Sequence, residues 1–170
     1  MNKITVPQRK THRVGVFVDV QNMYHSAKNL YKARVNFREL LKLATAGRQL
    51  VRAVAYVVKS DTEEEKAFFD ALEKAGFELK IKDLQIFPGG MKKGDWDVGL
   101  AVDAISLSKL LDVVVIISGD GDFEPLVEYL KFSGLIVETM GFKRSTSSKL
   151  TEAANNFIDL EESKEKVLLK

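Results

Sequence analysis

The stretch VVVIISGDGDF, residues 113–123, decides how this chain folds. Its first five residues are all β-branched and apolar, which is typical of a strand buried on both faces, as in a parallel sheet. The polar residues that follow end the strand abruptly and put Asp120 and Asp122 just past its carboxyl end. A parallel sheet needs further strands of the same character, joined by crossover connections.

Four more short apolar runs meet this need: Val14–Val20, Val51–Val58, Phe77–Ile81 and Ile136–Met140. Segments between them repeat apolar residues at spacings of three and four, as amphipathic helices do. We expect helices over residues 22–30, 36–46, 62–75, 97–111 and 123–132, and a last short helix within 150–160. This alternation predicts an α/β fold of three layers, in which helices cover both faces of a Rossmann-like parallel sheet.

The length of 170 residues suits one domain, which we place at residues 13–160, with the polar ends 1–12 and 161–170 as flexible termini. The absence of cysteine excludes disulfides, thiolate metal sites and a cysteine nucleophile. Two histidines are too few for a histidine-built metal site. No apolar run reaches the roughly 18 residues of a membrane span, and no apolar signal core follows the first methionine. We therefore expect a cytoplasmic protein that does not enter the membrane.

The net charge of +2 is unevenly distributed along the chain. Residues 1–60 carry 12 Lys or Arg against 2 acids, a net +10, whereas residues 61–170 carry 14 against 22, a net −8. Such asymmetry can indicate a face that binds a polyanion such as nucleic acid beside an acidic site. Two solvated surfaces without any partner explain the same numbers.

Carboxylates gather where a parallel sheet binds its ligands, outside the carboxyl ends of its strands. Asp19 ends the first predicted strand, Asp120 and Asp122 follow the fourth, and Asp97 begins a predicted helix. If these side chains converge, their repulsion calls for a cation, and oxygen ligands without Cys or His suit Mg²⁺ or Mn²⁺. Asp103 is the weakest candidate, because six residues correspond to about 240° around a helix, so it does not share a face with Asp97.

Each of these residues has a simpler explanation when taken alone. Asp19 and Asn22 could cap a helix, Asp97 could be an acid stabilised by the helix dipole, and SGDGD could form an ordinary turn. Asp103 could equally form a salt bridge, and Trp96 could pack in a half-buried position as readily as stack on a base. The joint placement, rather than any one residue, favours a site.

Three segments resemble the three motifs of NYN domains, in particular those of the LabA-like group: FVDVQNMY (17–24), KKGDWDVGLAVDAI (92–105) and SGDGDFEPLVEYLKFSG (118–134). SSKLTEAANNFIDL (147–160) resembles the closing segment of the family, although asparagine stands where an aspartate is often found. NYN domains belong to the PIN-like nuclease superfamily. The resemblance implies a PIN-like fold, a divalent metal held by aspartates, and the ribonuclease activity of characterised relatives. It also implies a homodimer, while other members of the family have no demonstrated activity.

Our hypothesis is therefore a metal-dependent nuclease that hydrolyses RNA. It assigns catalysis to Asp19, Asp97, Asp120 and Asp122, metal binding to Asp19, Asp97 and Asp120, and support to Asn22, Asp103 and Ser118. Four basic residues could approach the substrate backbone, and an exposed charge without a partner explains each of them equally: Lys92, Lys93, Lys143 and Arg144.

Two other functions compete with this hypothesis. A nucleic-acid-binding or regulatory module could keep the fold and cut little or nothing, although a pure binder gains nothing from carboxylates that repel phosphates. A phosphatase could use a similar sheet, but the haloacid-dehalogenase type needs a second aspartate two residues after Asp19, where Gln21 stands.

Overall fold

The computed structural model describes residues 6–7, 9–90, 92–93 and 95–170, and side chains between 91 and 94 fall outside that description. Six parallel strands form the central sheet in the order β4-β3-β1-β7-β8-β9. They are β1 (Arg13–Asp19), β3 (Gln49–Lys59), β4 (Glu78–Asp83), β7 (Val113–Ile117), β8 (Ile136–Gly141) and β9 (Asn156–Asp159). The five predicted strands and the parallel α/β architecture are confirmed.

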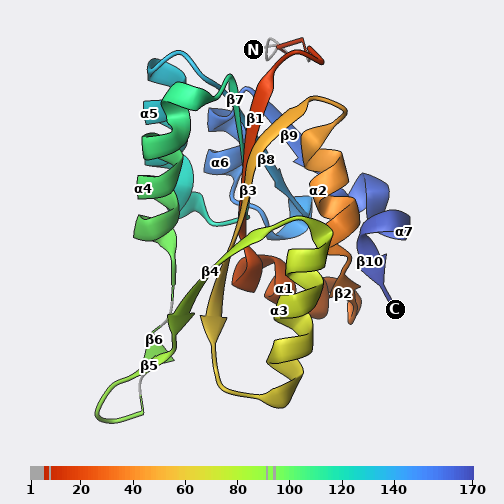
Figure 1. Cartoon of the computed structure of the whole chain (residues 1–170), viewed down its shortest axis with the longest axis vertical. Helices are drawn as coiled ribbons and strands as arrows, with labels where there is room; N and C mark the ends of the chain where they lie inside the picture. Colours follow the sequence, from red (N-terminus) through yellow and green to blue (C-terminus); the bar gives the residue numbers. More distant parts are fainter. Residues whose placement is uncertain (1–5, 8, 91, 94) are drawn as a thin grey trace.

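Helices cover both faces of the sheet, as Figure 1 shows. On one face lie α1 (Val20–Tyr31), α2 (Phe37–Thr45), α3 (Glu63–Ala75) and α7 (Lys164–Val167), and on the other α4 (Asp97–Leu107), α5 (Glu124–Phe132) and α6 (Ser148–Ala153). Each face has its own hydrophobic core. Along β1, Val16 and Val18 enter the first core and Phe17 enters the second, all fully buried. This two-sided burial explains why the predicted strands are continuous apolar runs.

The strand order reverses beside β1. This strand pairs with β3 on one side and with β7 on the other, with Asp19 opposite Tyr56 and Val18 opposite Ile117. Because all three strands are parallel, their carboxyl ends meet at one edge, at the lower end of the strands in Figure 1. Such a switch point is where open parallel sheets bind ligands, and Asp19 and Ser118 lie at it.

Residues 150–160 differ from the single short helix that we predicted. Helix α6 ends at Ala153, and the chain then forms the edge strand β9. Asn155 causes this change from helix to strand. Its backbone N–H donates to the carbonyl of Val137, and its side-chain oxygen accepts from the N–H of Val137. These bonds divert the chain to β8, and the following Phe157 favours a strand.

The C-terminal residues also differ from the predicted flexible terminus. Residues 164–169 form α7 and β10 (Leu168–Leu169), which pairs antiparallel with β2 (Arg34–Val35). Val167 is fully buried in the first core, which anchors this otherwise polar segment. Residues 1–5 and 8 of the predicted N-terminal extension lie outside the described residues.

The glycine-rich segment between β4 and α4 contains a small hairpin. Strands β5 (Gln85–Ile86) and β6 (Lys92–Lys93) pair antiparallel in it. In Figure 1 this hairpin projects away from the body of the protein, beyond the carboxyl edge of the sheet.

Candidate metal centre

Three aspartates from two separate parts of the chain meet at the carboxyl edge. One carboxylate oxygen each from Asp97, Asp120 and Asp122 lies within 4.8 Å of the other two. Asp97 is the first residue of α4, and the other two follow β7 in the turn that leads into α5. We call these three residues the acidic cluster.

Asp19 lies beside the acidic cluster and also caps a helix. Its Oδ1 accepts a hydrogen bond from the backbone N–H of Asn22 (3.2 Å), and its Oδ2 accepts one from the Ser118 hydroxyl (3.2 Å). The capping explanation is therefore correct, yet it leaves Asp19 at the site, because the second carboxylate oxygen contacts Ser118 at the end of β7.

Asn22 and Ser118 hold the loop after β7 in place. Asn22 Oδ1 accepts the N–H of Gly119 at 2.9 Å, and Ser118 Oγ accepts the N–H of Asp120 at 3.1 Å. Gly119 is required by a close approach, since a Cβ there would lie 2.3 Å from the carbonyl oxygen of Ser145. The loop after β7, which carries Asp120 and Asp122 and which we call the acidic loop, is thus fixed on two sides, by α1 and by the segment before α6.

The electrostatics of this edge disfavour the carboxylates in their charged form. Burial, together with the charges of Asp120, Asp95 and Asp19, raises the pKa of Asp97 to about 6. The pKa of Asp19 is also raised, first by burial and then, against its hydrogen bonds, by the neighbouring charges. A divalent cation would offset this repulsion, and a set of carboxylate and hydroxyl oxygens fits Mg²⁺ or Mn²⁺.

The Asp97 carboxyl should make the stability of the metal-free protein depend on pH. Since its folded-state pKa is raised, it contributes stability below pH 4 that is lost as the pH rises through 6. Asp97→Asn should therefore raise the melting temperature at pH 8 and leave it unchanged at pH 4. After allowance for solvent screening we expect about 1 kcal/mol, or roughly 2–4 °C. Melting curves in EDTA test this, and an equal shift at both pH values would contradict it.

Asp95 belongs to this edge and was missed from the sequence. Its Oδ1 accepts the backbone N–H of Asp97 at 3.3 Å, and its charge raises the pKa of both Asp97 and Asp19. The signal was present in the same GDWD segment, two residues before Asp97.

Asp103 and Trp96 lie in structural contacts instead. Asp103 Oδ2 accepts the hydroxyl of Tyr56 at 2.7 Å and forms an ion pair with Lys80 at 2.7 Å. Burial raises the pKa of Tyr56, so this hydroxyl stays protonated and donates. Trp96 donates from Nε1 to the carbonyl of Val57 at 2.9 Å, which supports the packing explanation.

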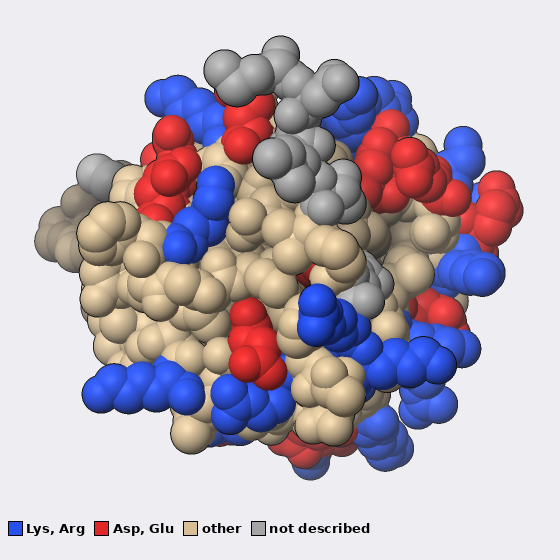
Figure 2. Space-filling model, turned by 90° about the horizontal axis from the view of Figure 1, so that it is seen from above, with Lys and Arg blue, Asp and Glu red and all other residues tan. Residues whose placement is uncertain are grey.

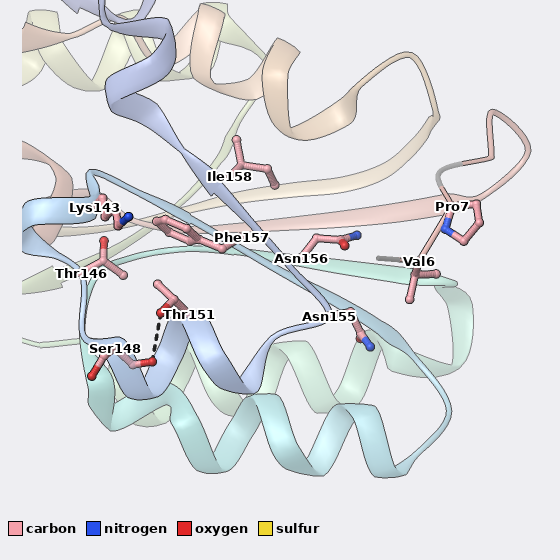
Figure 3. A pocket seen from close by; sticks show the side chains of 10 residues that line it. All are labelled: Val6, Pro7, Lys143, Thr146, Ser148, Thr151, Asn155, Asn156, Phe157 and Ile158. Carbon is pink, nitrogen blue, oxygen red and sulfur yellow. Dashed lines mark hydrogen bonds between the residues drawn. The ribbon is translucent and has the colours of Figure 1, made fainter. Parts of the chain in front are cut away.

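The predicted basic residues have different environments. Arg144 donates from Nε to Glu161 Oε1 at 2.8 Å and lies 5.3 Å from the ring centroid of Tyr31, so its charge is already engaged. Lys143 is exposed and lines a hollow of about 820 Å³ beside β9, drawn in Figure 3. The side chains of Lys92 and Lys93 lie outside the described residues.

The hollow beside β9 is not the chemical centre. Its wall consists of Val6, Pro7, Lys143, Thr146, Ser148, Thr151, Asn155, Asn156, Phe157 and Ile158, with no carboxylate or imidazole among them. Figure 3 shows that these side chains come from β9, from the loop and helix that precede it, and from the N-terminal segment. The acid chemistry lies instead at the switch point.

An acid-only cluster at the switch point of a parallel sheet defines a Rossmann-like domain with a candidate site for a divalent cation. The family model of the NYN domain matches residues 13–161, and this chain belongs to that family. NYN domains are part of the PIN-like nuclease superfamily, and the assignment from the three sequence motifs is confirmed.

The chain is also similar to two known proteins. The chain is 25% identical over 158 residues to the low amplitude and bright protein LabA of Synechococcus elongatus, covering 87% of this chain and 83% of LabA. It also matches the crystal structure of a protein of unknown function from Vibrio parahaemolyticus, with a TM-score of 0.86 and 32% identity over 96% of this chain and all of the other. No helix among the described residues has the length and apolar character needed to cross a membrane.

Proposed function

We propose that this protein is a nuclease that hydrolyses RNA phosphodiester bonds with Mg²⁺ or Mn²⁺. The observation that carries the proposal is the convergence of Asp97, Asp120 and Asp122 within 4.8 Å, at an edge where burial and mutual repulsion raise the pKa of Asp97. Membership of a nuclease-like family supports hydrolysis, and it also supports a nucleic acid as the substrate.

Asp19, Asp97 and Asp120 would hold the ion, directly or through water. When bound, such an ion offsets charge on a phosphoryl oxygen and lowers the pKa of a bound water. Asp122 is the exposed member of the acidic cluster, so it completes the ion site or accepts a hydrogen bond from the attacking water. Ser118 and Asn22 position Asp19 and the acidic loop through the bonds given above.

The substrate backbone would approach from the basic side chains nearest this edge. Lys143 is the best placed of the predicted four, because it is exposed, whereas Arg144 is paired with Glu161. Lys92 and Lys93 are also proposed to contact the substrate backbone, because they form strand β6 of the hairpin that precedes Asp95. We keep the homodimer and the cytoplasmic location as proposals, which a sizing column and cell fractionation test.

The test is cleavage of a labelled single-stranded RNA by the whole chain with Mn²⁺, with Mg²⁺ or with EDTA. We expect cleavage with either metal and none with EDTA, because the carboxylates cannot neutralise a phosphate without a cation. A fluorogenic phosphomonoester serves as the control substrate and should stay intact. RNA that binds but is never cut would favour the binding module, and phosphate release from the monoester would favour the phosphatase.

A further inference from the structure

A groove begins next to Asp19 and runs between α1 and α3. Its first part, about 600 Å³, is lined by Val20 and Gln21, the two residues that follow Asp19 in the chain. Its second part, about 470 Å³, continues past β2 to α2. The two parts share four lining residues and are therefore continuous: Tyr24, Arg34, Glu64 and Phe68. We call this hollow the α1–α3 groove.

Aromatic rings line the first part of the α1–α3 groove, and two of them, Tyr24 and Phe68, lie where its two parts join. Tyr24 is 43% exposed, and its ring meets that of His25 edge-on at 5.4 Å between centroids. Phe68 and Phe69 form the opposite side, on α3. An exposed ring in a concave site can stack on the face of any nucleobase, because every base offers a flat π surface.

Part of the unpaired positive charge of the first 60 residues lies at this groove. Four of the basic residues there have acidic partners: Arg13 with Asp112, Arg48 with Glu138, Arg52 with Glu78 and Lys59 with Asp61. By contrast, Arg34 and Arg38 line the groove and form no ion pair with any residue that the structure describes. Lys28 Nζ lies 5.7 Å from the ring centroid of Tyr24.

One exposed acid, Glu64, also lines both parts of the groove. Of the two glutamates that line the groove, Glu65 accepts hydrogen bonds from Ser60 and Thr62, which leaves Glu64 as the exposed acid. At the amino edge of the strands, seen in Figure 2, basic and acidic side chains are interspersed. The groove therefore joins two arginines, one exposed glutamate and aromatic rings in one hollow, which begins at the two residues that follow Asp19.

We propose that the α1–α3 groove is a base-binding subsite, in which Tyr24 stacks on a nucleobase of the bound strand and Arg34 contacts a neighbouring phosphate. This inference rests on the proposed nuclease function. Five residues separate Tyr24 from Asp19, so a bound strand has a rise of only about 7.5 Å to cover along the axis of α1. The base must be unpaired, because a duplex keeps its bases stacked inside the helix.

The experiment measures binding without turnover. Fluorescence anisotropy of a labelled oligouridine strand is recorded with Mn²⁺ on the full chain carrying Asp120→Asn. Tyr24→Ala is added to this parent, and we expect about a tenfold loss of affinity, within the range for base–aromatic stacking. Tyr24→Phe keeps the ring and should change the affinity less than twofold. Tyr129→Ala, which removes a 52% exposed ring from α5 on the other face of the sheet, is the matched control and should have no effect.

An abasic strand with the same number of phosphates separates stacking from charge. The abasic strand should bind the parent and the Tyr24→Ala protein equally. By contrast, Arg34→Gln should weaken the binding of both strands and reduce the salt dependence of binding. Equal affinity of parent and Tyr24→Ala for oligouridine would overturn the subsite, and so would equal losses for Tyr24→Ala and Tyr129→Ala. Metal-dependent cleavage by the wild type would then still leave the nuclease standing. A parent that binds no RNA, together with a wild type that does not cleave it, would remove both proposals.

Discussion

Asp120→Asn is expected to reduce RNA cleavage by more than about a hundredfold while leaving the fold intact. Removing a residue that only orients a metal ligand costs about 10–100-fold, and Asp120 is proposed as a direct ligand. The change removes one negative charge from the acidic cluster. It keeps a side-chain oxygen that can accept the hydrogen bond from the N–H of Asp122, which is 2.9 Å long in the wild type. Initial rates with Mn²⁺, together with melting curves of both proteins, measure the two effects.

The matched control is Asp70→Asn, which removes the same charge from an exposed position on α3 outside the acidic cluster. It should cleave at the wild-type rate. Without metal, Asp120→Asn should melt no lower than the wild type, because its charge raises the pKa of Asp97 and so opposes the charged state of that carboxyl. Unchanged cleavage in Asp120→Asn would exclude the acidic cluster as the catalytic centre.

The fold could be predicted from sequence where burial leaves a clear pattern. Runs such as Val113–Ile117 are apolar throughout because both faces of the sheet are covered, and this pattern identifies a strand without any other information. Strand β9 escaped prediction because its four residues are only half-buried at the edge of the sheet. Its position depends on the bonds between Asn155 and Val137, which are tertiary and leave no local signal.

The site could be predicted from the rule that parallel strands share a carboxyl edge, but its details could not. The rule predicts that Asp19 and Asp120 lie at the same edge. The position of Asp97 beside them depends on how the whole segment between β4 and α4 folds, which the rule does not predict. Helical geometry correctly separated Asp103 from Asp97, and Asp103 lies in a contact with Tyr56 and Lys80. Sequence spacing could not reveal the α1–α3 groove, because its walls come from helices that are distant in the chain.

The buried pair of Arg48 and Glu138 gives the largest stability effect that we expect. Their side chains are 2% and 1% exposed, and both guanidinium NH groups donate to the carboxylate, at 3.1 and 2.8 Å. Arg48 also donates to the carbonyls of Ala44 and Thr45, so it joins the end of α2 to β8. Removing one member of such a pair leaves the other charged and buried.

Arg48→Met should therefore lower the free energy of unfolding by about 3–5 kcal/mol, a large part of the roughly 5–15 kcal/mol that a typical domain has. The remaining side-chain donor to Glu138 is the amide of Asn156, at 3.2 Å, which cannot neutralise a carboxylate. Arg13→Met is the control, since it breaks a similar pair with Asp112 at side-chain exposures of 48% and 35%, where an ion pair contributes about 0–1 kcal/mol. Urea titration of both variants measures the difference.

The double change of Arg48→Met with Glu138→Met should recover part of the loss, because it also removes the unpaired buried charge of Glu138. Equal losses in Arg48→Met and Arg13→Met would show that burial of this pair does not determine its contribution to stability.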